Sequence, residues 1–238
     1  MPLGGEHVRM YAAVEASANG VTTPTRFAET ARRYGYDGIV LFQDERVPER
    51  VSAQTQMDIV CAGEIAVSDR GAIGGAIAKV RDHVRVLRGV ADSPDVLRVL
   101  SDQERLDVLA WPSDIGRISH TVATNAKEHG IFIELDLSPL VRSSGQRRVA
   151  ALERLVRLDT ILDHFDIPCV TTTRPRSHLE LRSPREIQSL GEVCGLNAGT
   201  IERGLRAWEQ ISQRSGRIED DSFIEPGVRT IDDETNDR

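Results

Sequence analysis

Seven arginines and one histidine lie in two short segments, each of which follows an expected strand. They are Arg142, Arg147, Arg148, Arg174, Arg176, His178, Arg182 and Arg185. Planar guanidinium groups bind phosphate oxygens well, and a helix expected to begin at Pro184 adds the partial positive charge of its N-terminus. If the two strands are adjacent and parallel, both segments lie at the same end of the sheet. The pattern therefore predicts a surface that binds nucleic acid or an acidic partner.

Each arginine also has a purely structural interpretation. Any one of them could be solvated, and Arg182 could form an internal salt bridge with Glu180 or Asp136. The prediction therefore concerns the group, because residues 142–185 contain nine arginines against five acidic residues. The same range contains a single aromatic residue, Phe165, so stacking of bases on aromatic rings is not expected. Recognition of the backbone or shape of a structured RNA fits better.

A metal-dependent phosphoesterase is the alternative from a different functional class. Such a site needs several His, Asp and Glu ligands at the carboxyl ends of strands. The six histidines are dispersed, and only His178 follows a strand. The first, fifth and last expected strands end at 14–17, 111–113 and 171–173, all without histidine. We therefore predict no metal site in this chain.

Two acidic residues belong to the sixth expected strand. Glu134 and Asp136 are two positions apart, so they point to the same face. That face could line the mouth of a functional pocket, or the carboxylates could pair with an arginine inside a barrel. We favour the pairing with an arginine.

The elements that would position these residues alternate between strand and helix. Apolar runs predict seven strands, at 8–14, 39–42, 58–67 with an interruption at Gly63, 84–90, 106–110, 131–136 and 170–173. Helices are expected from Thr23-Pro24, over 73–80, 94–100, 119–128 and 144–165, from the cap Ser183-Pro184-Arg185-Glu186, and from Asn197. Alternation of this kind indicates parallel strands, and we predict one α/β domain, a TIM-barrel-like (βα) barrel.

The chain divides into two parts by composition. Residues 1–213 are expected to form the barrel. Residues 214–238 contain four arginines, eight acidic residues and few large apolar side chains. Too little surface can be buried there to offset the entropy of ordering, so a disordered acidic tail is predicted.

The overall charge is acidic although the two segments above are basic. The net charge is −7, and only two of the 30 basic residues, Lys79 and Lys127, are lysine. This balance argues against a protein that coats nucleic acid generally, and it suggests a salt-adapted source such as a halophilic archaeon. Three cysteines without CxxC spacing suggest reduced thiols. With no apolar run long enough for a membrane helix and no signal peptide, we expect a cytoplasmic protein that has no membrane partner.

Three motifs resemble one known family. The segment Ser177-His-Leu-Glu-Leu-Arg-Ser-Pro-Arg-Glu186 after a late strand is the most specific of them. The others are Ile131-x-Ile-Glu-Leu-x-Leu-Ser-Pro-Leu140 before an arginine-rich helix start, and Phe27 followed by Tyr34-Gly-Tyr-Asp-Gly38. Together they resemble the archaeal and eukaryotic ribonuclease P protein subunit, which is component 3 in archaea. The resemblance covers about residues 8–213.

The resemblance implies a TIM-barrel-like fold related to the polymerase-histidinol-phosphatase (PHP) phosphoesterases, with the metal ligands lost. It implies a role in removing the 5′ leader from precursor tRNA, in which the RNA subunit performs Mg²⁺-dependent cleavage. The chain itself would need no cofactor, and the family pattern identifies no catalytic residue in it. It would bind and activate the catalytic RNA together with ribonuclease P protein component 2 and other protein subunits. A protein-binding scaffold without RNA contacts is a third possibility.

Overall fold

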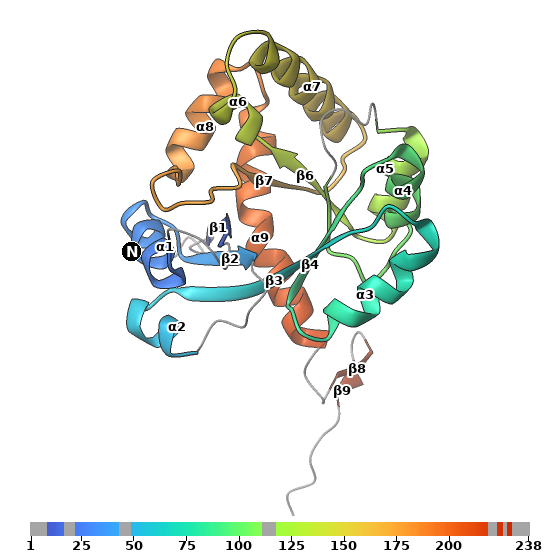
Figure 1. The fold of residues 1–238 in the computed structure, drawn as a ribbon, viewed down its shortest axis with the longest axis horizontal. Helices are drawn as coiled ribbons and strands as arrows, with labels where there is room; N and C mark the ends of the chain where they lie inside the picture. The colour runs from blue at the N-terminus through green and yellow to red at the C-terminus, as the bar shows by residue number, and fades with distance from the viewer. Residues whose placement is uncertain are drawn as a thin grey trace, which may run out of the picture.

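The computed structural model describes residues 9–16, 22–42, 49–110, 118–218, 223–225 and 228–229, without the side chains of 49, 50 and the residues after 214. Seven parallel strands pair in chain order into one sheet, which forms a nearly closed barrel (Figure 1). They are β1 (Tyr11–Glu15), β2 (Gly38–Phe42), β3 (Asp58–Ala66), β4 (Val86–Val90), β5 (Val108–Ala110), β6 (Phe132–Asp136) and β7 (Cys169–Thr172). The predicted fold, an α/β barrel with seven parallel strands, is confirmed.

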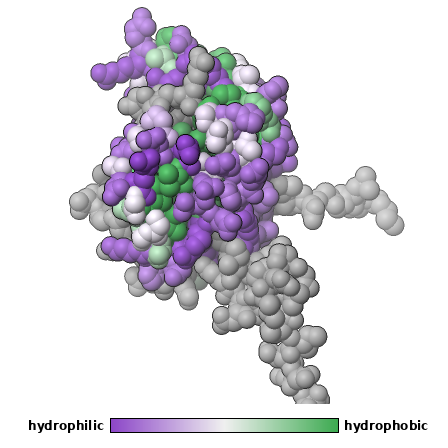
Figure 2. Space-filling view, turned by 90° about the vertical axis from the view of Figure 1, so that its right-hand side faces the viewer, coloured by the Kyte–Doolittle hydropathy of each residue, from purple (hydrophilic) through white to green (hydrophobic). Residues whose placement is uncertain are grey.

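Helices lie between successive strands around the outside of the barrel, except that the last two follow β7 and the final one packs against the barrel interior (Figure 1). They are α1 (Pro24–Arg33), α2 (Glu49–Thr55), the 3₁₀ turn η1 (Arg70–Ala72), α3 (Ile73–Arg81), α4 (Pro94–Leu100), α5 (His120–Glu128), α6 (Ser138–Arg142), α7 (Gly145–His164), α8 (Pro184–Val193) and α9 (Ala198–Ile218). The face over α3, α4 and α5 is mostly hydrophilic, with apolar side chains gathered in small patches (Figure 2). Within the described parts of the chain, none of the helices has the length and apolar character needed to cross a bilayer.

Local sequence signals explain where several helices begin. Thr23, Ser93 and Ser119 each accept a hydrogen bond from a backbone amide in the first turn of the helix that follows. At α8 the predicted capping box is confirmed. The Ser183 hydroxyl accepts from the Glu186 amide at 3.3 Å, and the Glu186 carboxylate accepts from the Ser183 amide at 2.7 Å.

Three details differ from the prediction. Strand β3 runs without interruption through Gly63, where an added Cβ would lie 2.7 Å from Val80 Cγ1, so this glycine allows α3 to approach the strand closely. The short helices α2 and α6 were not expected. Residue 8, the predicted start of the first strand, and residues 111–113, the predicted end of the fifth, lie outside the described residues.

The last helix extends beyond the boundary predicted at residue 213. Helix α9 continues to Ile218, and two short strands follow, β8 (Phe223–Glu225) and β9 (Val228–Arg229), which pair antiparallel. The remaining residues of the predicted acidic tail lie outside the described residues. That they are disordered stays a prediction.

Helix α9 fills the gap between the first and last strands. β1 and β7 are the two edge strands of the sheet. The Glu15 amide at the end of β1 donates a hydrogen bond at 2.9 Å to the Pro175 carbonyl, which follows β7. Trp208 on α9 is fully buried, and its Nε1 donates to the Thr171 carbonyl at 3.0 Å. Gly204 lets the helix approach β7, because an added Cβ would lie 2.2 Å from Thr171 Oγ1. The helix thus completes the wall and contributes to the interior core.

Candidate functional site

The interior of the barrel changes from apolar to charged along the strands. Alternate residues of each strand point inward. Those nearer the amino ends of the strands form an apolar core with Trp208 of α9. Four charged residues continue the same inward pattern toward the carboxyl ends of the strands. They are Glu15 on β1, Glu64 on β3, Arg88 on β4 and Glu134 on β6. We call these four residues together with Arg174, which follows β7, the mouth cluster.

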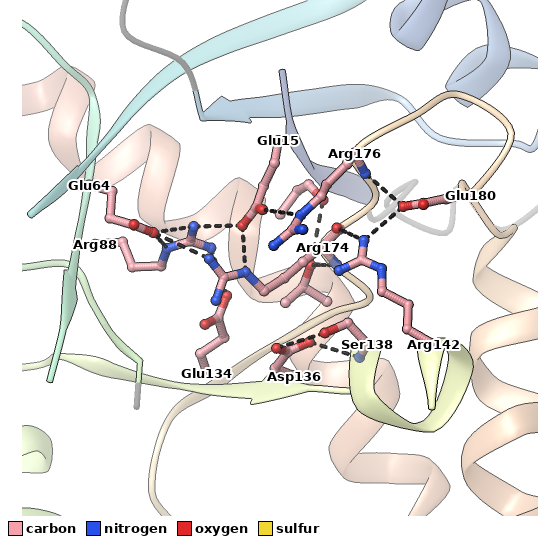
Figure 3. A network of polar contacts seen from close by, with 12 residues as sticks. Glu15, Glu64, Arg88, Glu134, Asp136, Ser138, Arg142, Arg174, Arg176 and Glu180 are labelled. Carbon is pink, nitrogen blue, oxygen red and sulfur yellow. Dashed lines mark hydrogen bonds and ion pairs between the residues drawn. The ribbon is translucent and has the colours of Figure 1, made fainter. Parts of the chain in front are cut away.

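Arg88 is the centre of the mouth cluster (Figure 3). Its residue exposure is 1%. Its Nε donates to Glu64 at 2.8 Å, and its two terminal nitrogens donate to Glu134 and Glu15, each at 2.9 Å. The guanidinium also lies 3.9 Å from the centroid of the Phe42 ring. Every nitrogen of this buried cation therefore has an anionic partner, as burial of a charge requires.

Arg174 is the second cation of the mouth cluster. Its Nε donates to Glu15 at 2.5 Å, and a terminal nitrogen lies 3.4 Å from Glu64. Its backbone has a φ of 44°, which is uncommon for a residue other than glycine. Arg174 was predicted to contribute to a binding surface. Its side chain is 23% exposed and forms ion pairs within the mouth cluster (Figure 3), and its contact with RNA stays a prediction.

Burial and charge pairing act in opposite directions on the pKa values of the carboxylates at the mouth. Burial acts to raise the pKa of Glu15, but Arg174 and Arg88 hold that pKa below its ordinary value. Burial dominates at Glu134 and raises its pKa, although Arg88 opposes this change. Asp136 also has its pKa raised by burial, against hydrogen bonds from the amide and hydroxyl of Ser138 at 2.8 and 3.0 Å. The predicted pairing of this acidic pair with an arginine holds for Glu134, whereas Asp136 is bound by Ser138.

A second group lies outside the mouth cluster. The Glu180 carboxylate accepts hydrogen bonds from an Arg142 terminal nitrogen at 2.7 Å and from the Arg176 amide at 2.9 Å. Arg142 also donates to the Arg174 carbonyl. The segments after β6 and β7 are therefore joined at one end of the barrel, as predicted from parallel pairing of these strands.

The remaining predicted residues are held to different degrees. Arg148 donates to the Ser143 carbonyl, and Arg182 donates to the carbonyls of Leu179 and Leu181, so neither proposed partner of Arg182 is used. His178 is half-buried, and its Nδ1 lies 3.0 Å from Thr22 Oγ1.

Five of the predicted arginines are exposed, and three of these make no side-chain hydrogen bond within the described part of the chain. The Arg176 side chain is 70% exposed and lies 3.6 Å from Glu15. Arg147 and Arg185 are exposed in the first turns of α7 and α8, and their side chains form no ion pair or hydrogen bond with the described part of the chain. We call Arg147, Arg176 and Arg185 the rim arginines.

Glu15, Glu64 and Arg88 were not among the site residues predicted from the sequence. One signal could have found them. Arg88 is a single charged residue within the apolar strand Val86–Val90, and a charge in a buried strand requires a partner. Its partners come from strands far away in sequence, so their identity needed the fold.

The mouth cluster does not fit a metal ion. Guanidinium groups lie between its carboxylates, where a cation would have to bind. Among the residues described by the structure, no group of three or more His, Cys, Asp and Glu side chains is arranged to hold a metal. That the chain needs no cofactor stays a prediction, which metal analysis of the purified protein can test.

Known proteins resemble this chain in sequence and in fold. The family model for RNase P subunit p30 matches residues 10–218. Ribonuclease P protein component 3 from Halobacterium salinarum is 38% identical over 224 residues, which cover 92% of this chain and 97% of that protein. The protein of the same name from Halorubrum lacusprofundi is 37% identical over 232 residues, with the same coverage.

Two solved structures share the barrel. A chain in an archaeal ribonuclease P bound to mature tRNA matches with a TM-score of 0.80 and 16% identity, covering 95% of this chain and all of the other. A zinc-containing histidinol phosphate phosphatase from Lactococcus lactis matches with a TM-score of 0.54 and 10% identity, covering 79% of this chain and 95% of the other. At these identities the likeness concerns the fold alone.

Proposed function

Because this chain belongs to the RNase P subunit p30 family, we propose that it is a protein subunit of ribonuclease P that binds and activates the catalytic RNA. The holoenzyme removes the 5′ leader from precursor tRNA by endonucleolytic cleavage. The observation that carries the proposal is the family match, which spans the whole barrel from residue 10 to residue 218. Its partners are the catalytic RNA, ribonuclease P protein component 2 and other protein subunits, and precursor tRNA is the substrate of the assembly.

The chemistry of cleavage is assigned to the RNA subunit and its Mg²⁺, with no catalytic residue in this chain. The contents of the barrel mouth support this division. In a metal phosphoesterase the mouth would present ligands to a metal ion and its bound water. Here Arg88 and Arg174 bind the carboxylates of Glu15, Glu64 and Glu134.

The rim arginines are the proposed contact with RNA. Arg147 and Arg185 lie in the first turns of two helices, where the helix N-termini add partial positive charge. They are exposed, so they can reach phosphate oxygens without leaving a buried carboxylate unpaired. Arg142, Arg148, Arg182 and His178 border the rim and are held by contacts within the chain, which gives them a supporting role in shaping this surface.

The direct test is reconstituted cleavage of precursor tRNA. The cognate RNA subunit and component 2 would be assayed with and without this chain, at limiting Mg²⁺ and several salt concentrations. We expect the chain to raise the rate or lower the Mg²⁺ requirement. No effect on cleavage, combined with hydrolysis of a phosphoester by the chain alone in Mn²⁺, would instead identify a stand-alone metal phosphoesterase.

A matched pair of double variants tests the surface. Arg147→Ala with Arg185→Ala should reduce the stimulation of cleavage. Arg32→Ala with Arg98→Ala removes the same charge from exposed positions in the last turns of α1 and α4, at the other end of the barrel, and should leave the stimulation unchanged. Equal loss in both variants would show that only net charge matters. A scaffold that binds protein alone would show neither loss nor salt-dependent RNA binding.

We also propose that the protein acts in the cytoplasm. Support comes from the three cysteines, Cys61, Cys169 and Cys194, which are all free thiols. Burial raises the pKa of the Cys169 thiol to about 12, so this thiol stays protonated and unreactive.

A further inference from the structure

Three carboxylates from three different strands converge on one point in the barrel mouth. Glu15, Glu64 and Glu134 each place an oxygen within 2.9 Å of a nitrogen of the same guanidinium, that of Arg88 (Figure 3). The strands β1, β3 and β6 are not neighbours in the sheet, so the barrel itself brings these side chains together. Without a cation at the centre, three carboxylates would face one another, and that of Glu134 is almost fully buried.

Convergent oxygen ligands are also what hard divalent cations require. Ca²⁺, Mg²⁺ and Mn²⁺ are bound by carboxylates from several elements, commonly with water completing the coordination. In open α/β barrels such sites lie at the carboxyl ends of the strands, and this is where the mouth cluster lies. The arrangement therefore resembles a cation site in which the cation is a side chain of the protein.

We propose that the Arg88 guanidinium takes the place of a divalent cation in the barrel mouth, and that Glu15, Glu64 and Glu134 become a binding site for Mn²⁺ when this guanidinium is removed. The inference goes beyond the proposed role in ribonuclease P, because it concerns what holds the barrel mouth together. Arg88 then has a structural role, and the three carboxylates can bind a divalent cation once its guanidinium is removed.

The Arg88 guanidinium differs from a bound metal ion in its single charge and in its covalent attachment to the chain. Burial acts to lower the pKa of Arg88, but the carboxylates of Glu134, Glu64 and Glu15 raise it above its ordinary value, so the guanidinium stays charged. The guanidinium cannot be removed by a chelator or exchanged. The mouth of this barrel is therefore expected to keep its structure whether or not divalent ions are present.

The balance of charges indicates why one divalent ion suffices. The three carboxylates face the two positive charges of Arg88 and Arg174. Removing Arg88 leaves Arg174 as the remaining mouth cation, together with the space that the guanidinium occupied. One divalent ion with bound water would occupy that space, and its two positive charges would more than replace the single charge of Arg88.

The experiment uses the full chain and Mn²⁺ as the probe, with no RNA present. Thermal unfolding of wild type and of Arg88→Ala would be followed in EDTA and in Mn²⁺, and binding would be followed by the loss of the electron paramagnetic resonance signal of free Mn²⁺. We expect Arg88→Ala to unfold at a lower temperature in EDTA. At Mn²⁺ about 100 times above Kd its midpoint should rise by roughly 5 to 10 °C, whereas wild type should not respond.

Two further variants keep the proposal falsifiable. Arg88→Gln retains a hydrogen-bond donor at lower cost to folding, so it decides the question if Arg88→Ala does not fold even in Mn²⁺; it should also be stabilised by the ion. Arg88→Gln combined with Glu134→Gln removes one ligand and should lose this response. The proposal is overturned if Mn²⁺ stabilises neither single variant, if it stabilises wild type equally, or if the response survives the loss of Glu134.

Discussion

The mouth cluster and the rim arginines contain the same type of side chain in opposite settings. Arg88 is 1% exposed and has three carboxylate partners, whereas the Arg176 side chain is 70% exposed and has one at 3.6 Å. The guanidinium groups of Arg88 and Arg174 form ion pairs with carboxylates of the mouth cluster, so they attract an approaching phosphate only weakly. The charge at the rim is available. Arginines that lie near the same strand ends can therefore have different roles. The role of each depends on whether its side chain is paired with carboxylates of the protein.

The difference also concerns energy. A buried ion pair costs much when one partner is lost, because the other is left charged and unsolvated. An exposed arginine costs little when lost, and it can bind a partner without first breaking internal contacts. The mouth should therefore respond to mutation through stability, and the rim through RNA binding.

The largest expected effect is on the stability of the mouth. Arg88→Ala should lower the free energy of unfolding by about 3 to 5 kcal/mol, because it leaves Glu134 buried without its partner. Urea unfolding monitored by circular dichroism measures this change. The control Arg185→Ala removes the same charge at the rim and should stay within about 0.5 kcal/mol of wild type. Equal stability of the two variants would contradict the distinction between mouth and rim.

Arg174 tests where the border between the two groups lies. Its side chain is 23% exposed and pairs with Glu15 and Glu64. Arg174→Ala should cost about 1 to 3 kcal/mol of stability, because it removes charge-assisted hydrogen bonds. It should not change the dependence of RNA affinity on salt. A reduced salt slope in a variant of unchanged stability would return Arg174 to the RNA-binding surface.

Sequence reasoning predicted the fold well, since buried parallel strands are apolar runs separated by helices. Residues Ile39 to Phe42 are one such run, and each of them is buried. Helix α6 was missed because no element was expected between the strand at 131–136 and the helix over 144–165, although Pro139 suits the first turn of a helix.

The site was harder to predict than the fold. Pairing of Glu134 with an arginine was expected, but its partner lies 46 residues away, and such a pairing depends on the register and curvature of the whole barrel. Arg174 was assigned to the surface because its neighbours are polar. Its backbone φ of 44° and the direction of its side chain could not be derived from residue type. Which of the predicted arginines are exposed also needed the fold, since Arg147 and Arg185 are exposed whereas the Arg174 side chain is 23% exposed.

The rim arginines should determine how strongly the affinity for RNA depends on salt concentration. The affinity of the chain for the catalytic RNA would be measured over a range of KCl concentrations for wild type and for Arg147→Ala with Arg185→Ala. Loss of two phosphate contacts should reduce the slope of log affinity against log salt by roughly 1.4 to 1.8. The variant with Arg32→Ala and Arg98→Ala should keep the wild-type slope. If both slopes fall equally, the rim arginines have no special role.

The smallest expected effect concerns Glu180, which lies between the mouth and the rim. Burial acts to raise its pKa, but hydrogen bonds from the Arg176 amide and from Arg142 lower the pKa below its ordinary value. A carboxylate of this kind stabilises the fold above its unfolded-state pKa, about 4.3, and the contribution is lost as pH falls through the lower folded-state pKa.

Glu180→Gln should therefore reduce the free energy of unfolding by about 0.5 to 1 kcal/mol near neutral pH, a small value because the side chain is 43% exposed. The gap between the two proteins should close as the solution is acidified below the folded-state pKa. Urea unfolding of both proteins at a series of pH values measures it. A gap that stayed constant down to about pH 3 would show that the Glu180 charge is not held by these bonds. A gap of several kcal/mol would instead place Glu180 energetically with the mouth.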